Sequence, residues 1–192
     1  MTTPQPRVPT PDGGPLVVFD VETQNLFEEI DGGARRAGKL LLSVAVSYDA
    51  DADVFRTFTE ANVAELIDQL FSARLVVGYN TIKFDYAVLK PYTDKRFNRV
   101  PTLDIFDHLY RRTGYRSRLD TVAKETHGIG KTGSGRDAIE LWRTGKIDEL
   151  VDYCREDVRI THELYRYGVE NGAVFTRDRS GKKVKIPVMW GK

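Results

Sequence analysis

Short runs of apolar residues mark the buried strands that this chain is predicted to form. Leu16 to Phe19 is continuous and rich in β-forming residues, as is typical of a central strand, and Leu75 to Gly78 has the same character. Leu40 to Tyr48 and Val54 to Thr59 are predicted to be the strands of a hairpin, because an aspartate-rich linker separates them. Pro101 to Asp104 is predicted to be a third core strand.

Helical periodicity follows and interrupts these strands. Asn62 to Ser72 places four apolar residues on one face and begins with a residue suited to capping. Another helix is expected to begin near Phe84. The second half of the chain predicts helices over residues 104–112, 117–127, 136–144 and 147–170, then a hairpin formed by 173–177 and 182–188. Strands followed by interleaved and consecutive helices predict an α/β fold with a mixed sheet covered by helices.

The length of 192 residues fits one domain with a real core. Residues 1–15 contain five prolines and no periodicity, so we expect a disordered tail followed by a single domain over 16–192. No apolar run approaches the roughly 20 residues that cross a bilayer, and the start lacks a signal-peptide core. The lone Cys154 excludes an internal disulfide and a cysteine-cluster zinc site. We therefore expect a cytoplasmic protein without membrane contact.

Charge is balanced overall but not locally. The net charge is +1, whereas residues 111–136 contain seven basic residues and two acids. One interpretation is a solvated surface of helices and loops. The other is a track for a phosphate backbone, with Arg116, Arg118 and Lys131 as phosphate contacts and Tyr115 stacking on a base.

Two pairs of residues have spacings that suit metal chemistry. Asp20 and Glu22 lie at i and i+2 at the end of a predicted strand, so both carboxylates leave the same face. Tyr153 and Asp157 lie at i and i+4 on a predicted helix and also share a face. If that helix packs against the strand end, Asp157 joins the acid pair. Such oxygen-rich clusters suit Mg²⁺ or Mn²⁺.

Together with Asn80-Thr81-Ile82-Lys83-Phe84-Asp85, these pairs resemble the three motifs of DEDD-type 3′→5′ exonucleases. Tyr153-x-x-x-Asp157 is similar to the last motif of the tyrosine subclass. The histidine subclass would need histidine five residues before the last acid, and that position is Asp152. The glycine-rich, basic stretch Ile30 to Lys39 is less typical of the family.

The resemblance, which covers Val17 to Tyr167, implies a ribonuclease H-like fold with a five-stranded mixed sheet flanked by helices. It implies that two divalent ions, Mg²⁺ or Mn²⁺, bind four carboxylates, and that Tyr153 orients the attacking water. The substrate implied is single-stranded DNA or RNA with a free 3′ end, which is cut to nucleoside 5′-monophosphates. The implied metal ligands are Asp20, Glu22, Asp85 and Asp157, and the expected substrate contacts are Asn80, Lys83, Phe84, Arg116, Arg118 and Lys131.

Other functions remain open at this point. The domain is alternatively a proofreading exonuclease that serves a DNA polymerase in trans, or a nucleic-acid-binding module with little catalysis. The sequence names no protein partner. A nucleotide-binding loop at 128–133 is disfavoured because a predicted helix, not a strand, precedes it. A calcium loop starting at Asp49 is disfavoured because Val54 stands where the pattern requires glycine.

Overall fold

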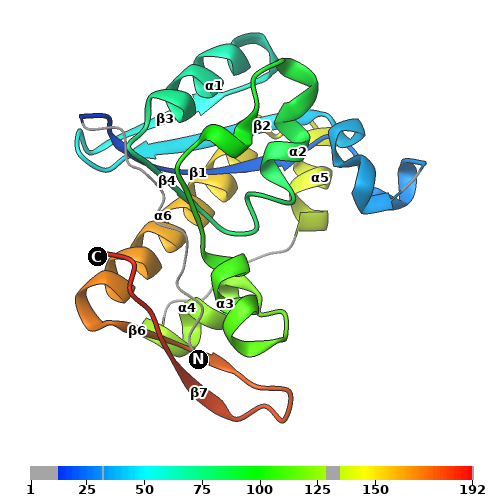
Figure 1. The fold of residues 1–192 in the computed structure, drawn as a ribbon. Helices are drawn as coiled ribbons and strands as arrows, with labels where there is room; N and C mark the ends of the chain where they lie inside the picture. Colours follow the sequence, from blue (N-terminus) through cyan, green and yellow to red (C-terminus); the bar gives the residue numbers. More distant parts are fainter. Residues whose placement is uncertain (1–12, 32, 129–134, 192) are drawn as a thin grey trace.

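The computed structural model describes residues 13–31, 33–128 and 135–191. Its main sheet has five strands in the order β3-β2-β1-β4-β5 (Figure 1). β1 pairs antiparallel with β2 and parallel with β4, β2 pairs antiparallel with β3, and β4 pairs parallel with β5. The predicted mixed sheet is therefore confirmed. The strands are β1 (Leu16–Thr23), β2 (Leu42–Asp49), β3 (Val54–Phe58), β4 (Leu75–Gly78) and β5 (Thr102–Asp104).

The central strand β1 separates two hydrophobic cores. Its odd-numbered residues pack with α1 (Val63–Ser72) and α2 (Asp85–Leu89) on one face of the sheet. Its even-numbered apolar residues pack with α6 (Ile147–Asn171) on the other face. The strand continues through both acids instead of ending before them, so the same alternation turns Asp20 and Glu22 toward the α6 side.

The remaining helices follow the predicted order: α3 (Ile105–Thr113), α4 (Leu119–His127) and α5 (Gly135–Arg143). One expectation is wrong. Asn62 does not cap α1 with its side chain, because that side chain accepts a hydrogen bond from the Thr59 amide instead (2.8 Å). Short 3₁₀ helices connect the elements: η1 (Phe27–Glu29), η2 (Gly33–Leu40), η3 (Glu60–Asn62), η4 (Lys90–Tyr92) and η5 (Phe97–Arg99).

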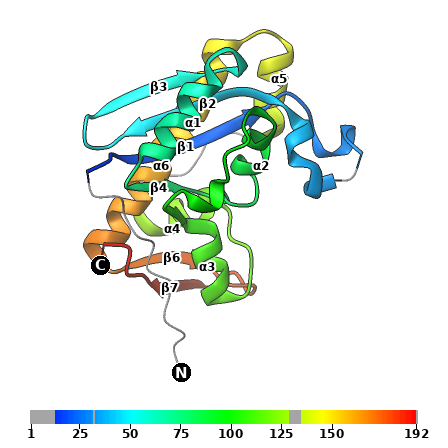
Figure 2. The same ribbon diagram turned by 45° about the horizontal axis from the view of Figure 1, so that its top comes forward.

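A separate two-stranded sheet ends the chain. β6 (Ala173–Arg177) and β7 (Lys183–Pro187) form the predicted hairpin. It lies beside α3 and α4, away from the main sheet (Figures 1 and 2). The Thr126 hydroxyl of α4 accepts a hydrogen bond from the Phe175 amide (3.0 Å), which fixes the hairpin against that helix.

Most of the expected tail, residues 1–12, lies outside the described residues. The carbonyl groups of Gly14 and Pro15 accept hydrogen bonds from Arg74, just before β4. Among the helices that the structure describes, none is both long enough and apolar enough to cross a bilayer.

Candidate active site

Three carboxylates meet where β1 faces α6. Asp20 and Glu22 come from the strand and Asp157 from the helix, and one oxygen of each lies within 4.8 Å of the others. Asp157 is buried, whereas the two strand acids are partly exposed. The cluster forms because the i, i+2 spacing of the strand puts its acids on the face that α6 covers. The predicted juxtaposition of Asp157 with the acid pair is thus present.

Cys154 lies directly beneath this cluster. Its side chain is fully buried, and Sγ is 3.5 Å from the carbonyl oxygen of Asp20 and 3.8 Å from its carboxylate. Burial raises the pKa of the Cys154 thiol well above its ordinary value, and the negative charges of Asp20, Glu22 and Asp157 act in the same direction. A thiol kept protonated in this way is a packing group and a weak donor, not a nucleophile.

Asp85 approaches the acid pair from the other face of the sheet. It begins α2 and is almost completely buried. One of its oxygens accepts a hydrogen bond from the amide of Val21, the residue between the two strand acids (3.1 Å). Burial, and then the charge of Asp20, raise the pKa of Asp85 well above its ordinary value. Asp85 is not one of the three clustered carboxylates, and its role as a metal ligand stays a prediction.

Tyr153 lies on α6 one helical turn before Asp157. Its ring is partly buried and packs against the core between α6 and the sheet. The i, i+4 spacing gives the phenol and the clustered carboxylate a shared helix face. This is the arrangement that the water-orienting role requires, although that role also remains a prediction.

Asp104 is a positioning residue that the sequence did not reveal. It is buried at the end of β5, and its carboxylate accepts hydrogen bonds from three backbone amides: Asn80 (2.9 Å), Ile82 (3.0 Å) and Asp107 (3.1 Å). It thereby caps α3 and holds the turn after β4, where Asn80 has a left-handed φ of 69°. Burial raises the pKa of Asp104, and the three amide hydrogen bonds oppose that effect. The sequence signal that could have identified Asp104 is its position as an aspartate between a predicted strand and a predicted helix.

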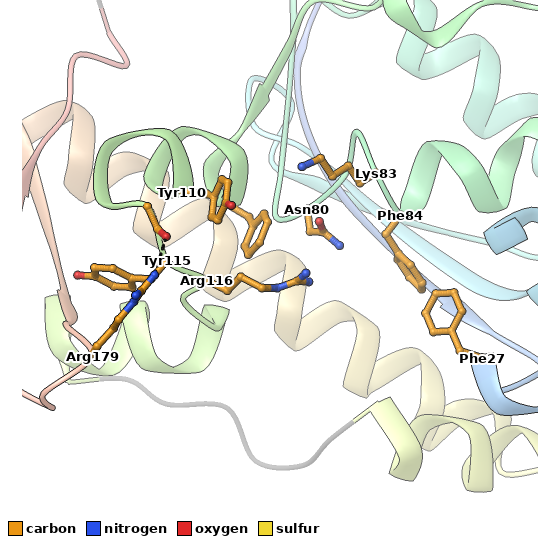
Figure 3. Close-up of a pocket in the computed structure, with 10 residues that line it drawn as sticks. Phe27, Asn80, Lys83, Phe84, Tyr110, Tyr115, Arg116 and Arg179 are labelled. Carbon is orange, nitrogen blue, oxygen red and sulfur yellow. Dashed lines mark hydrogen bonds between the residues drawn. The ribbon is translucent and has the colours of Figure 1, made fainter. Parts of the chain in front are cut away.

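A pocket of about 650 Å³ adjoins this turn. Figure 3 shows Phe27 and Phe84 at one end, Tyr115 and Arg179 at the other, and Arg116 extending between them. Five of its ten lining residues are aromatic and three are basic, which is the composition expected of a surface that stacks bases and holds phosphates. The lining residues are Phe27, Asn80, Lys83, Phe84, Phe106, Tyr110, Gly114, Tyr115, Arg116 and Arg179.

Two of the three basic side chains of the pocket lie over aromatic rings. The Arg116 guanidinium is 5.2 Å from the centre of the Phe106 ring, and the Lys83 ammonium is 5.7 Å from the centre of the Tyr110 ring. Phe106 and Tyr110 stack on each other along α3, with their centres 6.2 Å apart. Cation–π contacts of this kind hold positive charges at the pocket, and Lys83 also forms an ion pair with Asp107 (4.0 Å).

Two ion pairs hold the Phe27 end of the pocket in place. Glu28 pairs with Arg136 (2.8 Å) and Glu29 pairs with Arg143 (2.6 Å), which ties η1 to α5. Phe27 itself contacts Phe84, with ring centres 6.0 Å apart. The segment after β1 thus contacts α5 through these exposed ion pairs and Phe84 through Phe27, which lines the pocket.

Four predicted substrate contacts, Asn80, Lys83, Phe84 and Arg116, line this pocket. Arg118 is exposed at the start of α4 and is not a lining residue. Lys131 lies outside the described residues. The sequence analysis does not predict four of the lining residues. They are Phe27 of η1, Phe106 and Tyr110 of α3, and Arg179 of the C-terminal hairpin. Tyr115, which the sequence analysis predicts to stack on a base, does line the pocket.

The donor set fits a hard divalent cation. Its members are carboxylate oxygens, which Mg²⁺ and Mn²⁺ prefer. The negative charge of these carboxylates also affects the pKa values of neighbouring groups. Burial is the main cause of the raised pKa values of Asp85 and Cys154, and negative charge from the cluster adds to both. A cation bound here would relieve that repulsion.

A family model described as the RNase H superfamily matches residues 17–169. The chain belongs to the RNase H superfamily. A search of curated proteins found no match. Members of the RNase H superfamily are commonly nucleases that use divalent metals, and the acidic cluster lies within the matched segment. The hairpin of β6 and β7 lies beyond it.

Proposed function

We propose that the protein is a metal-dependent 3′→5′ exonuclease that degrades single-stranded DNA or RNA and releases nucleoside 5′-monophosphates. One observation carries the proposal: three carboxylates from β1 and α6 cluster within 4.8 Å in an RNase H superfamily domain. The direction of degradation rests on the resemblance of the three motifs to DEDD-type exonucleases.

In this proposal, Asp20, Glu22 and Asp157 hold divalent cations, and Asp85 completes the ligand set. When bound, the cations supply Lewis-acid stabilisation of the phosphate and a water acidic enough to attack it at neutral pH. The Val21 amide donates a hydrogen bond to one oxygen of Asp85 and holds this carboxyl beside the strand acids. Cys154 supports Asp20 from below through its contact with the backbone carbonyl.

Tyr153 positions the attacking water in this proposal. A phenol has a reference pKa near 10, so at neutral pH it donates or accepts a hydrogen bond and does not remove a proton. Asn80, Lys83, Phe84 and Arg116 hold the substrate strand. The aromatic rings of the pocket offer faces on which the bases of the strand can stack.

The test is incubation of the purified protein with single-stranded DNA and RNA labelled at the 5′ end, in Mn²⁺ and in EDTA. We expect a ladder that shortens from the 3′ end in Mn²⁺ only, together with free nucleoside monophosphates. Asp20→Asn should abolish this activity. Asp68→Asn is the matched control, because Asp68 is an exposed aspartate that pairs with Lys95 on the far side of α1.

Several results would contradict the proposal. Full hydrolysis in EDTA or by Asp20→Asn would exclude the metal mechanism. Early loss of the 5′ label would exclude the direction. Binding of intact strands without any shortening would instead favour a nucleic-acid-binding module.

A further inference from the structure

The C-terminal hairpin contributes a charge to a pocket that otherwise belongs to the matched domain. Arg179, in the turn between β6 and β7, lines the pocket and donates a hydrogen bond to the carbonyl of Gly114 (3.2 Å). Gly114 ends α3, so this contact seats the turn of the hairpin against the end of that helix. The hairpin lies outside residues 17–169, and its arginine is therefore an addition to the family segment.

Arg179 lies at the end of the pocket that is farther from Phe27 and Phe84 (Figure 3). Phe84 directly precedes Asp85, and the Phe27 ring packs against Phe84 at a tilt of 59°, so this end of the pocket is the one next to Asp85. Arg179 and Tyr115 lie at the opposite end (Figure 3). A strand whose terminal nucleotide reaches the acids can extend past Arg116 to Arg179. We expect a mononucleotide or dinucleotide bound at the acid end to make less contact with Arg179 than a longer strand.

Most of the basic side chains of the hairpin form no ion pair with a carboxylate in the part of the chain that the structure describes. Residues 177–185 contain five basic residues and one acid. Arg177 forms an ion pair with the buried Glu125 of α4 (2.7 Å), so its role is structural. Among the described residues, the other basic side chains form no ion pair with a carboxylate. They are Arg179, Lys182, Lys183 and Lys185, all exposed.

We propose that the turn of the β6–β7 hairpin, through Arg179, is a second anchor for the substrate strand and makes the site selective for polynucleotides over very short oligonucleotides. The inference rests on the proposed nuclease function. The guanidinium binds a backbone phosphate upstream of the terminal nucleotide, and Tyr115 beside it stacks a base. The contacted chemistry, phosphate and base face, is common to DNA and RNA.

The experiment measures KM and binding for dinucleotide, tetranucleotide, octanucleotide and dodecanucleotide substrates, with DNA and RNA in separate arms. Wild-type affinity should rise with length until the strand reaches the hairpin. Arg179→Ala should weaken dodecanucleotide binding about two- to fivefold, the range of one exposed charge contact. It should reduce the salt slope for the dodecanucleotide by roughly 0.7, the value for one phosphate contact on a single strand. The penalty should be smaller for the dinucleotide.

Arg166→Ala is the matched control, because Arg166 is an exposed arginine on α6 that pairs with Glu170 (3.1 Å) and does not line the pocket. It should leave length dependence and salt slope unchanged. Arg179→Lys, which keeps the charge, should restore the salt slope. Thermal unfolding of each variant separates lost binding from lost folding.

The outcomes distinguish the two proposals. If the wild type neither binds nor cuts any strand, the proposed function fails. If it cuts strands but Arg179→Ala weakens the dinucleotide and the dodecanucleotide equally, or changes neither, the anchoring role of the hairpin is overturned while the nuclease function stands. A length effect confined to the RNA or the DNA arm supports the anchor and identifies the preferred substrate.

Discussion

Asp104 connects the stability of the fold to the geometry of the site, and its substitution has a calculable cost. Its Oδ1 accepts hydrogen bonds from the amides of Asn80 and Asp107, and its Oδ2 accepts one from the amide of Ile82. Asp104→Asn preserves size and one acceptor oxygen. The new amino group faces the Ile82 amide, so two donors oppose each other in a buried place.

The loss of one hydrogen bond to a buried carboxylate costs about 1.5–3 kcal/mol of unfolding free energy. For a chain of 192 residues, each kcal/mol shifts Tm by about 2–4 °C, so Asp104→Asn should lower Tm by roughly 3–12 °C. Asp104→Ala removes all three acceptor contacts and should cost more. Because the turn that contains Asn80 lines the pocket, KM for strands should also rise more than kcat falls.

The assay is urea and thermal unfolding followed by circular dichroism, with Asp68→Asn as the surface control. Asp68 is exposed and pairs only at the surface, so its substitution should change stability by less than about 0.5 kcal/mol. If Asp104→Asn is as stable as this control, the three amide contacts do not hold the turn, and the positioning role of Asp104 is refuted.

Three further predictions concern the acids and the phenol. Tyr153→Phe should lower the single-turnover rate by ten- to a thousandfold, roughly 1.4–4 kcal/mol, and should leave Mn²⁺ affinity unchanged in calorimetry; equal loss of metal would contradict the water-positioning role. Asp157→Asn removes a clustered carboxylate and should weaken Mn²⁺ binding as well as the rate; unchanged Mn²⁺ binding would remove Asp157 from the ligand set. Burial and the charge of Asp20 raise the pKa of Asp85, so the native state holds that proton more tightly than the unfolded chain. In EDTA, stability should therefore fall as pH rises above about 4 and through the raised pKa, and Asp85→Asn should flatten this fall in urea titrations; an unchanged pH profile would argue against it.

Much of the site could be predicted from the sequence, because local spacing determines which side chains share a face of a strand or a helix. The two-residue spacing of Asp20 and Glu22 on a strand dictates a shared face, and the four-residue spacing of Tyr153 and Asp157 on a helix does the same. Apolar runs and helical periods predicted the elements that carry them, including the C-terminal hairpin. The resemblance to the three motifs of DEDD-type exonucleases then indicated that these residues belong to a single site.

Only the tertiary structure decided how separate segments meet. Packing of α6 on the even-numbered face of β1 brings Asp157 to the strand acids, and no local pattern encodes that contact. The three amide bonds to Asp104 and the pocket built from η1, the turn after β4, α3 and the hairpin join residues far apart in the chain. Such contacts depend on the relative placement of whole elements, which buried side chains on several of them determine together. For this reason the sequence alone does not identify Phe27 and Arg179 as pocket residues.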